Sequence, residues 1–355
     1  MQNFVHLHVH TQYSLLDGQA SIPRLVDKAL KDGMPGIAVT DHGNMFGIKE
    51  FWNYVAKKNG QKHDNIKRQT KLLDQMNKLL AEHSDLSQYK DEVAVLVSQL
   101  QSKIENSKEF SIEDNEELAK YKSLHSAIES MEKEFNYDPQ VAQEKIDSLK
   151  AIDDFKPIIG CEVYVARESM HLKRREVKSD LGGWHLILLA KNLEGYKNLI
   201  KIVSNAWTDG FYNRPRTDHT ELEKYHEGII CCSACIGGEI PKLILSGNMQ
   251  AVEESILWHK SIFGDDYYLE LQRHPASVER ANHDTIKLQN QVNEVLIPLA
   301  RKHNVKLICT NDVHFVNEQD ADAHDCLIAI NSRQDFNSPD RMLYSKQEWL
   351  KTRAP

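Results

Sequence analysis

The segment Phe4–Thr11 carries three histidines at alternate positions, His6, His8 and His10. In a β-strand, residues two apart project from the same face, so these imidazoles would stand together at one end of a sheet. Grouped imidazoles are typical metal ligands. A strand whose buried histidines simply find hydrogen-bond partners is the alternative interpretation.

Metal-binding residue types recur at or near the ends of the other apolar runs. They are Asp41, His42, Glu162, His185, Cys235, Glu270, His274, Asp312 and His314. Parallel α/β barrels assemble their sites at the carboxyl ends of their strands, so this recurrence predicts one shared site. Glu162 and His185 fit the rule imperfectly, because they lie within a run or at its start.

The residue types indicate the chemistry of such a site. Imidazole with carboxylate suits zinc, manganese or iron, and a thiolate would favour zinc. There are too many ligands for one tetrahedral ion. Two or three neighbouring ions would bind a phosphate and lower the pKa of a bound water, which favours phosphoester hydrolysis. Metals that only stabilise the fold are the alternative.

Short apolar runs alternate with amphipathic stretches along most of the chain. The runs are Phe4–Val9, Gly36–Thr40, Pro157–Val165, Trp184–Ala190, Gly228–Ser233, Tyr267–Gln272 and Val305–Thr310. The amphipathic stretches include Ile22–Leu30, Tyr196–Ala206, Gln250–Phe263 and Thr285–His303. This alternation predicts a parallel sheet with helical crossovers, closed or nearly closed into a barrel. An open doubly wound sheet is the alternative.

Residues 59–155 interrupt this alternation with long helical patterns and are predicted to be a helical insertion. Ser111 with Asp114 resembles a capping box, and Asp138 before Pro139 resembles a helix start. The segment holds 13 Lys and Arg against 20 Asp and Glu, most of the chain's net charge of −8. It is therefore a poor candidate for gripping DNA. A solvated helical bundle and a docking surface for a protein both remain open.

The composition is that of an ordinary globular chain of 355 residues, 41% hydrophobic and 27% charged. No apolar stretch is long enough to span a bilayer and no leader is visible, which predicts a cytoplasmic protein without membrane contact. The six cysteines lack the spacing of a disulfide framework or a zinc ribbon and are expected to be mostly buried thiols.

Five motifs together resemble those of the polymerase and histidinol phosphatase (PHP) family. They are His8-Val9-His10, Thr40-Asp41-His42-Gly43, Gly160-Cys161-Glu162, His185 and Asn311-Asp312-Val313-His314. The phrases Phe4–His10, Tyr13–Gly18, Pro157–Val165 and Thr310–Phe315 resemble, more narrowly, the amino-terminal PHP domains of bacterial replicative DNA polymerases. This resemblance covers nearly all of the chain outside the insertion.

The resemblance implies a distorted seven-stranded (β/α) barrel with a site for two or three ions of zinc, manganese or iron. The implied ligands are His8, His10, Asp17, His42, Glu162, His185, Cys235, Asp312 and His314. Asp17 enters only through the resemblance, and Cys235 could instead be a structural thiol. Asp312 and His10 are the implied catalytic residues, and Asp41 would orient a ligand. His6, Glu270 and His274 are expected to lie nearby, the last two near the rim, without binding metal.

The expected organisation is a barrel from residues 1–58 and 156–335, the insertion at 59–155, and from 336–355 the start of a linker toward polymerase domains. Insertion at this place departs from the family pattern, in which Lys58 would lead almost directly into Lys156. Basic side chains on loops at the barrel mouth could meet a substrate phosphate. These are Lys173, Arg174, Arg175, Arg214 and Arg216.

Three functions remain open at this point. The first is a metal-dependent phosphoesterase, here a 3′→5′ proofreading exonuclease within a protein that performs DNA-directed DNA synthesis. The second is a metal-stabilised scaffold that docks a separate exonuclease subunit or other replisome proteins. The third is a free-standing phosphatase for a small metabolite such as histidinol phosphate. The first two imply DNA as a partner through the polymerase, and the polymerase-like phrases disfavour the third.

Overall fold

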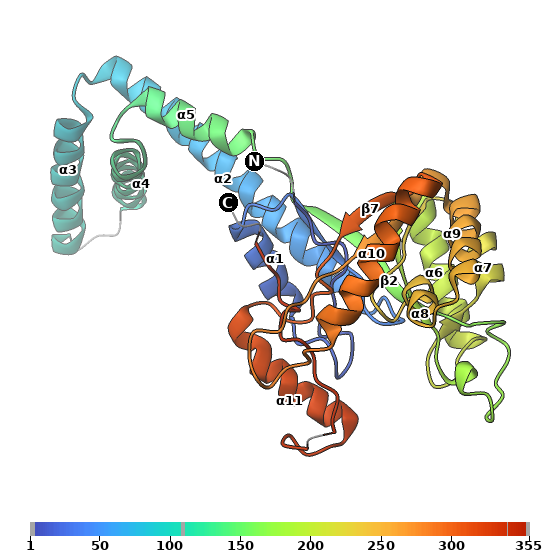
Figure 1. The fold of residues 1–355 in the computed structure, drawn as a ribbon. Helices are drawn as coiled ribbons and strands as arrows, with labels where there is room; N and C mark the ends of the chain where they lie inside the picture. The colour runs from blue at the N-terminus through green and yellow to red at the C-terminus, as the bar shows by residue number, and fades with distance from the viewer. Residues whose placement is uncertain (1–3, 108–110, 339, 353–355) are drawn as a thin grey trace. The chain divides into compact units, whose positions relative to one another are not determined.

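The computed structural model describes residues 4–107, 111–338 and 340–352. The chain forms two compact units (Figure 1). One, called here the barrel unit, comprises the chain up to Ala56 together with the chain from Phe155 onward. The other, the helical unit, is Lys57–Asp154. Among the described residues, no helix is both long enough and apolar enough to cross a membrane.

The barrel unit is built on one curled seven-stranded sheet. Its strands are β1 (Gly36–Val39), β2 (Lys156–Val165), β3 (Trp184–Ala190), β4 (Arg216–Thr217), β5 (Ile229–Cys232), β6 (Tyr267–Leu271) and β7 (Lys306–Cys309). Their order is β1-β2-β3-β5-β6-β7, with β4 paired to β2. This mixed α/β architecture confirms the predicted distorted barrel.

Strand β3 corrects the expectation of a parallel sheet, because it runs antiparallel to both neighbours, β2 and β5. The pairs β1/β2, β5/β6 and β6/β7 are parallel. Between β2 and β3 the chain forms only the short 3-10 helix η1 (Lys178–Leu181). A parallel return needs a crossover, usually an α-helix, so the chain comes back in the opposite direction.

The histidine-rich first segment is extended but is not a regular strand, since only Val9 forms a bridge, with Val313. On one side it pairs with β1, where Ala38 N donates to His6 O at 2.9 Å and Thr40 N donates to Val9 O at 2.8 Å. On the other side His10 N donates to Val313 O at 2.7 Å. The segment thus connects β1 to the chain that follows β7, which closes the curl of the sheet.

Helices cover the sheet. They are α1 (Ile22–Lys31), α6 (Leu193–Thr208), α7 (His219–Lys224), α8 (Glu239–Leu245), α9 (Met249–Phe263), α10 (Thr285–His303) and α11 (Ala321–Ser332), with the 3-10 turns η2 (Gly264–Asp266) and η3 (Glu318–Asp320). Each long helix buries one apolar stripe. In α1, Ile22, Leu25, Val26 and Ala29 recur at helical spacing and are buried. These stripes pack against the sheet and form its core.

The helical unit contains most of α2 (Ile48–Glu82) and all of α3 (Leu86–Asn106), α4 (Ile112–Phe135) and α5 (Pro139–Lys150). Its helix starts are capped by side chains. Ser111 Oγ accepts a hydrogen bond from Asp114 N, and Asp138 Oδ1 accepts one from Gln140 N. The core includes Met76, Met131 and Phe135. Local sequence therefore accounts for both the helices and their ends.

The chain from residue 340 to 352 differs from the expected linker, because it packs against the barrel. His314 N donates to Glu348 O at 2.7 Å, and Leu350 N donates to Phe315 O at 3.1 Å. Leu350 and Ser345 are fully buried. We therefore revise the expectation of a linker from residue 336 and assign this segment to the barrel unit.

Candidate metal centre

Four side chains converge at the closed end of the barrel: His8, His10, Glu162 and Asp312. His8 Nε2 lies 3.1 Å from His10 Nε2, 2.9 Å from Glu162 Oε2 and 3.1 Å from Asp312 Oδ1. His10 Nε2 lies 3.2 Å from Asp312 Oδ1 and 3.7 Å from Glu162 Oε2. A tetrahedral ion with bonds of about 2.0–2.1 Å separates its ligands by about 3.3 Å. The four atoms match that spacing.

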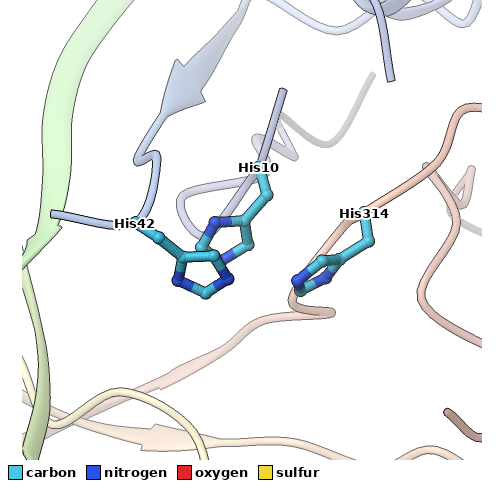
Figure 2. A group of neighbouring side chains, drawn as sticks. All are labelled: His10, His42 and His314. Atoms are coloured by element: carbon cyan, nitrogen blue, oxygen red, sulfur yellow. The ribbon is translucent and has the colours of Figure 1, made fainter. Parts of the chain in front are cut away.

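A second group consists of His10, His42 and His314. Figure 2 shows the three imidazoles gathered at one point although they come from separate segments. The ring centroid of His10 lies 4.0 Å from that of His42 and 4.3 Å from that of His314. His42 follows β1 and His314 follows β7, so the curl of the sheet brings them to the first segment.

A third group consists of Glu162, His185 and Cys235. His185 Nδ1 lies 2.8 Å from Glu162 Oε1 and 3.6 Å from Cys235 Sγ. Glu162 thus offers Oε2 to the first group and Oε1 to the third, the arrangement of a carboxylate that bridges two ions. Gly237 permits this approach, because a Cβ there would lie 3.0 Å from His185 Nδ1.

Asp17 joins the same cluster through His42, since His42 Nε2 lies 2.9 Å from Asp17 Oδ2. The Tyr344 hydroxyl, from the C-terminal segment, donates to Asp17 Oδ1 at 2.9 Å. The structure therefore brings all of the side chains that the resemblance implied as ligands into one neighbourhood. Shared use of His10 and Glu162 links the groups into a centre for two or three ions.

Glu270 orients His8, a role that the sequence did not indicate. Glu270 Oε1 lies 2.7 Å from His8 Nδ1 and also accepts from Gln272 Nε2 at 2.9 Å. Glu270 is buried rather than at the rim. A carboxylate inside an apolar strand was the available signal. Because Nδ1 donates to Glu270, the Nε2 lone pair of His8 is directed at the cluster.

His10 is oriented in a similar way by Asp41. Ser14 Oγ donates to Asp41 Oδ1 at 2.7 Å and lies 3.1 Å from His10 Nδ1, which therefore donates to the hydroxyl. Asp41 also accepts from Thr11 N at 2.6 Å. His6 and His274 do not join these groups: His6 Nε2 lies 2.8 Å from Lys351 O, and His274 Nε2 lies 3.1 Å from Asn311 O. Both are buried, so His274 is not at the rim as expected.

The electrostatics of the cluster favour a cation. Burial would raise the pKa of Glu162, but His185 and His42 hold that pKa well below its usual range. Burial would also raise the pKa of Asp312, which His8 and His10 outweigh in the same direction. Conversely, burial lowers the pKa of His8, but Asp312 and Glu270 raise it well above normal. Without metal, protons on imidazoles balance the carboxylates, and a metal ion would displace them.

One buried atom tests the fit of a metal to this site. Asp312 Oδ1 accepts no hydrogen bond of good geometry from the described residues, although it is buried. It faces two imidazole nitrogens that are themselves oriented from behind. Asp312 also adopts a left-handed backbone conformation, with φ of 47°, which Asp tolerates better than most residues. Nitrogen, carboxylate and thiol donors together suit zinc, manganese or iron.

Two cavities open onto the cluster. The larger, about 690 Å³, is lined by Asp17, His42 and His185 and by the aromatic residues Phe46, Trp207 and Phe211. The smaller, about 270 Å³, is lined by residues that include Glu162, Cys235, Asp312 and His314. The candidate ligands therefore lie between two spaces that small molecules or chain ends can enter.

Of the basic residues expected to meet phosphate, Arg214 lines the larger cavity. Its guanidinium lies 5.3 Å from the centre of the Tyr164 ring, and Nη1 donates to the Tyr164 hydroxyl at 3.3 Å. Lys173 and Arg175 are exposed and line neither cavity.

Arg216 and Arg174 are engaged elsewhere. The Arg216 side chain is buried and donates to the carbonyls of Gly210, Asp180, Met170 and Leu172. The Arg174 guanidinium pairs with Asp180 and Glu168. Donors that are already satisfied inside the protein cannot turn to a ligand without breaking those bonds. We therefore withdraw Arg174 and Arg216 from the phosphate-binding candidates.

Comparison with known proteins agrees with this geometry. The model of the PHP domain family matches residues 6–73 and 83–274, which is more than half of the chain. DNA polymerase III subunit alpha of Borreliella burgdorferi is 35% identical over 348 residues, and that of Thermus aquaticus is 30% identical over 348 residues. Both alignments cover 98% of this chain but only 21% and 20% of the relatives, so the chain spans about a fifth of their length. The chain belongs to the PHP domain family and is homologous to part of DNA polymerase III alpha subunits.

Proposed function

We propose that this PHP domain hydrolyses phosphodiesters at the 3′ end of DNA in a metal-dependent reaction, as a 3′→5′ proofreading exonuclease. The observation that supports it most is the complete donor set around Glu162, with the two imidazoles of His8 and His10 each oriented from behind. The similarity to polymerase subunits supports a role within a longer protein that performs DNA-directed DNA synthesis. DNA would then be the partner through the whole protein.

Zinc, manganese or iron bound to this donor set would polarise the phosphate and lower the pKa of a coordinated water. Hydrolysis forms a bond from a water oxygen to phosphorus and breaks the bond from phosphorus to the 3′ oxygen, which leaves with a proton. Asp312 and His10 are the residues of the chain that we assign closest to the reacting phosphate. Arg214, at the wall of the larger cavity, would bind a phosphate oxygen.

An aromatic wall favours a nucleic-acid substrate over a small metabolite. Phe46, Trp207 and Phe211 are each between 40% and 56% exposed, although they are large apolar side chains. Their rings contact one another at centroid distances of 5.7 Å and 5.5 Å, and Trp207 Nε1 donates to Gly43 O at 2.8 Å. Exposed, fixed aromatic rings beside a phosphate site are suited to stacking on bases of a single strand. Histidinol phosphate offers no comparable stacking surface.

A second candidate is a metal-stabilised scaffold that docks a separate exonuclease subunit or other replisome proteins. The observation that favours it is the number of segments that the centre would tie together. Ligands come from the first segment, β2, β3, the loop after β5 and the chain after β7. Metal binding that joins distant segments contributes directly to folding free energy.

Cleavage of single-stranded DNA distinguishes these candidates. DNA labelled at its 5′ end is incubated with the full chain and Mn²⁺ or Zn²⁺. We expect progressive shortening from the 3′ end, abolished by Asp312→Asn or His10→Ala, while Arg214→Ala mainly raises KM. Trp207→Ala should also raise KM, whereas Trp52→Ala, a half-exposed tryptophan outside the cavity, should not. Equal cleavage by the wild type and Asp312→Asn would exclude the enzymatic proposal and favour the scaffold.

A further inference from the structure

A separate group of potential ligands lies in the barrel unit, away from the centre described above. His219 is the first residue of α7, Glu239 is the first residue of α8, and His259 lies within α9. One donor atom from each lies within 4.8 Å of the others, and His219 Nε2 is 3.4 Å from Glu239 Oε2. None of the three belongs to the groups around Glu162.

The tautomer of His259 can be read from its contacts. His259 Nδ1 lies 2.9 Å from Ser255 O, and a carbonyl oxygen only accepts, so Nδ1 carries the proton. Burial also lowers the pKa of His259, to about 4, which keeps the ring neutral. Nε2 therefore presents a lone pair. The side chain is only 1% exposed, and Nε2 has no hydrogen-bond partner among the described residues.

Two further polar atoms here share this condition. His219 Nε2 and the Tyr267 hydroxyl are buried, and neither has a hydrogen-bond partner among the described residues. The ring of His219 is stacked on Trp258 at 4.0 Å, and that of Tyr267 is stacked on His259 at 5.1 Å. Buried polar atoms are almost always satisfied, so several unsatisfied ones around one carboxylate indicate a missing ligand.

We propose that His219, Glu239 and His259 bind a divalent transition-metal ion of the zinc class. Two imidazole nitrogens and one carboxylate oxygen form a common zinc ligand set, which leaves one position for a water or a neighbouring hydroxyl. The bond from His259 Nδ1 to a backbone carbonyl is the arrangement that fixes metal-binding histidines in the required tautomer. The ion satisfies the buried lone pair, which no donor of the described chain reaches.

This second site stabilises the loop that serves the first centre. Residues 233–238 connect β5 to α8, carry Cys235 and end next to Glu239. Within this loop Gly237 O accepts from His185 N at 3.1 Å, and Gly238 bridges His185. An ion on Glu239 therefore fixes the end of the loop that positions Cys235 and His185. Its role is structural, and it does not depend on whether the first centre is catalytic.

The test is a count of bound zinc in the full chain. Protein stripped with a chelator is dialysed against buffered Zn²⁺, and bound zinc is measured by elemental analysis. We expect His219→Ala to lose one equivalent relative to the wild type, and Glu239→Gln to do the same. His303→Ala is the matched control, because His303 pairs with Glu253 at 3.2 Å without a third ligand. His303→Ala should lose none.

The same loss must occur in an Asp312→Asn background, which separates this site from the first centre. His219 tolerates substitution because its side chain is 37% exposed, and circular dichroism verifies folding. Co²⁺ provides a second readout, since binding beside Trp258 should quench tryptophan fluorescence in the wild type but not in His219→Ala. Equal zinc content in the wild type, His219→Ala and Glu239→Gln would overturn the proposal.

Discussion

The two units of this chain bury very different side chains. The barrel unit encloses histidines and carboxylates such as His8, His10, Glu162 and Glu270, all at most 3% exposed. Among the described residues of the helical unit, Gln69 is the one polar side chain that is buried. Its interior is otherwise apolar, and its charges lie on the surface. One unit is thus stabilised by packing, whereas the other encloses charges that require a cation or protons to balance them.

Removal of metal should have the largest effect on this comparison. A chelator should destabilise the barrel unit and leave the helical unit nearly unchanged, because only the former encloses the ligand groups. At a free metal concentration 1,000 times the Kd, bound metal stabilises a fold by about 4 kcal/mol. Hydrogen exchange read by mass spectrometry measures both units within one protein. Equal loss of protection in both units would show that their stabilities are not separate.

Glu270→Gln should weaken metal binding at the first centre without removing a ligand. The amide can still contact His8 Nδ1, but it no longer provides the negative charge that stabilises the ring as a donor. Loss of such an orienting group lowers metal affinity about 10- to 100-fold. Zn²⁺ titration by isothermal calorimetry gives the affinity. Glu253→Gln, on the outside of α9, is the control, and an equal loss in both variants would contradict the assignment.

Asp138→Ala tests the other side of the comparison. The Asp138 carboxylate accepts from Gln140 N at 2.8 Å at the start of α5, and losing such a cap costs about 1 kcal/mol. We expect faster hydrogen exchange in α5 and unchanged metal content. A change in bound metal would mean that the helical unit contributes to the centre.

Deletion of the helical unit should leave the centre intact. All candidate ligands lie outside Lys57–Asp154, so a short Gly/Ser bridge from Ala56 to Phe155 retains every one of them. Phe155 must be kept, because it is buried in the barrel core. Bound metal per chain should equal that of the full protein. Reduced metal content in a folded deletion variant would show that the helices support the barrel.

The sequence alone determined those features that depend on neighbours along the chain. The apolar stripe of α1, the caps at Ser111 and Asp138 and the helical character of the insertion follow from spacing and residue type. The residue types at the ends of the apolar runs also indicated the metal chemistry, because parallel strands end at one edge. Family resemblance added Asp17, which spacing did not reveal.

Tertiary structure decided what distant segments do to each other. The direction of β3 depends on the absence of a crossover helix after β2, and the burial of Arg216 depends on carbonyls from three other parts of the chain. The contact of Glu270 with His8 joins residues 262 positions apart. The group of His219, Glu239 and His259 arises where three helices meet. Such contacts depend on how the sheet curls, and no local pattern of residues records that.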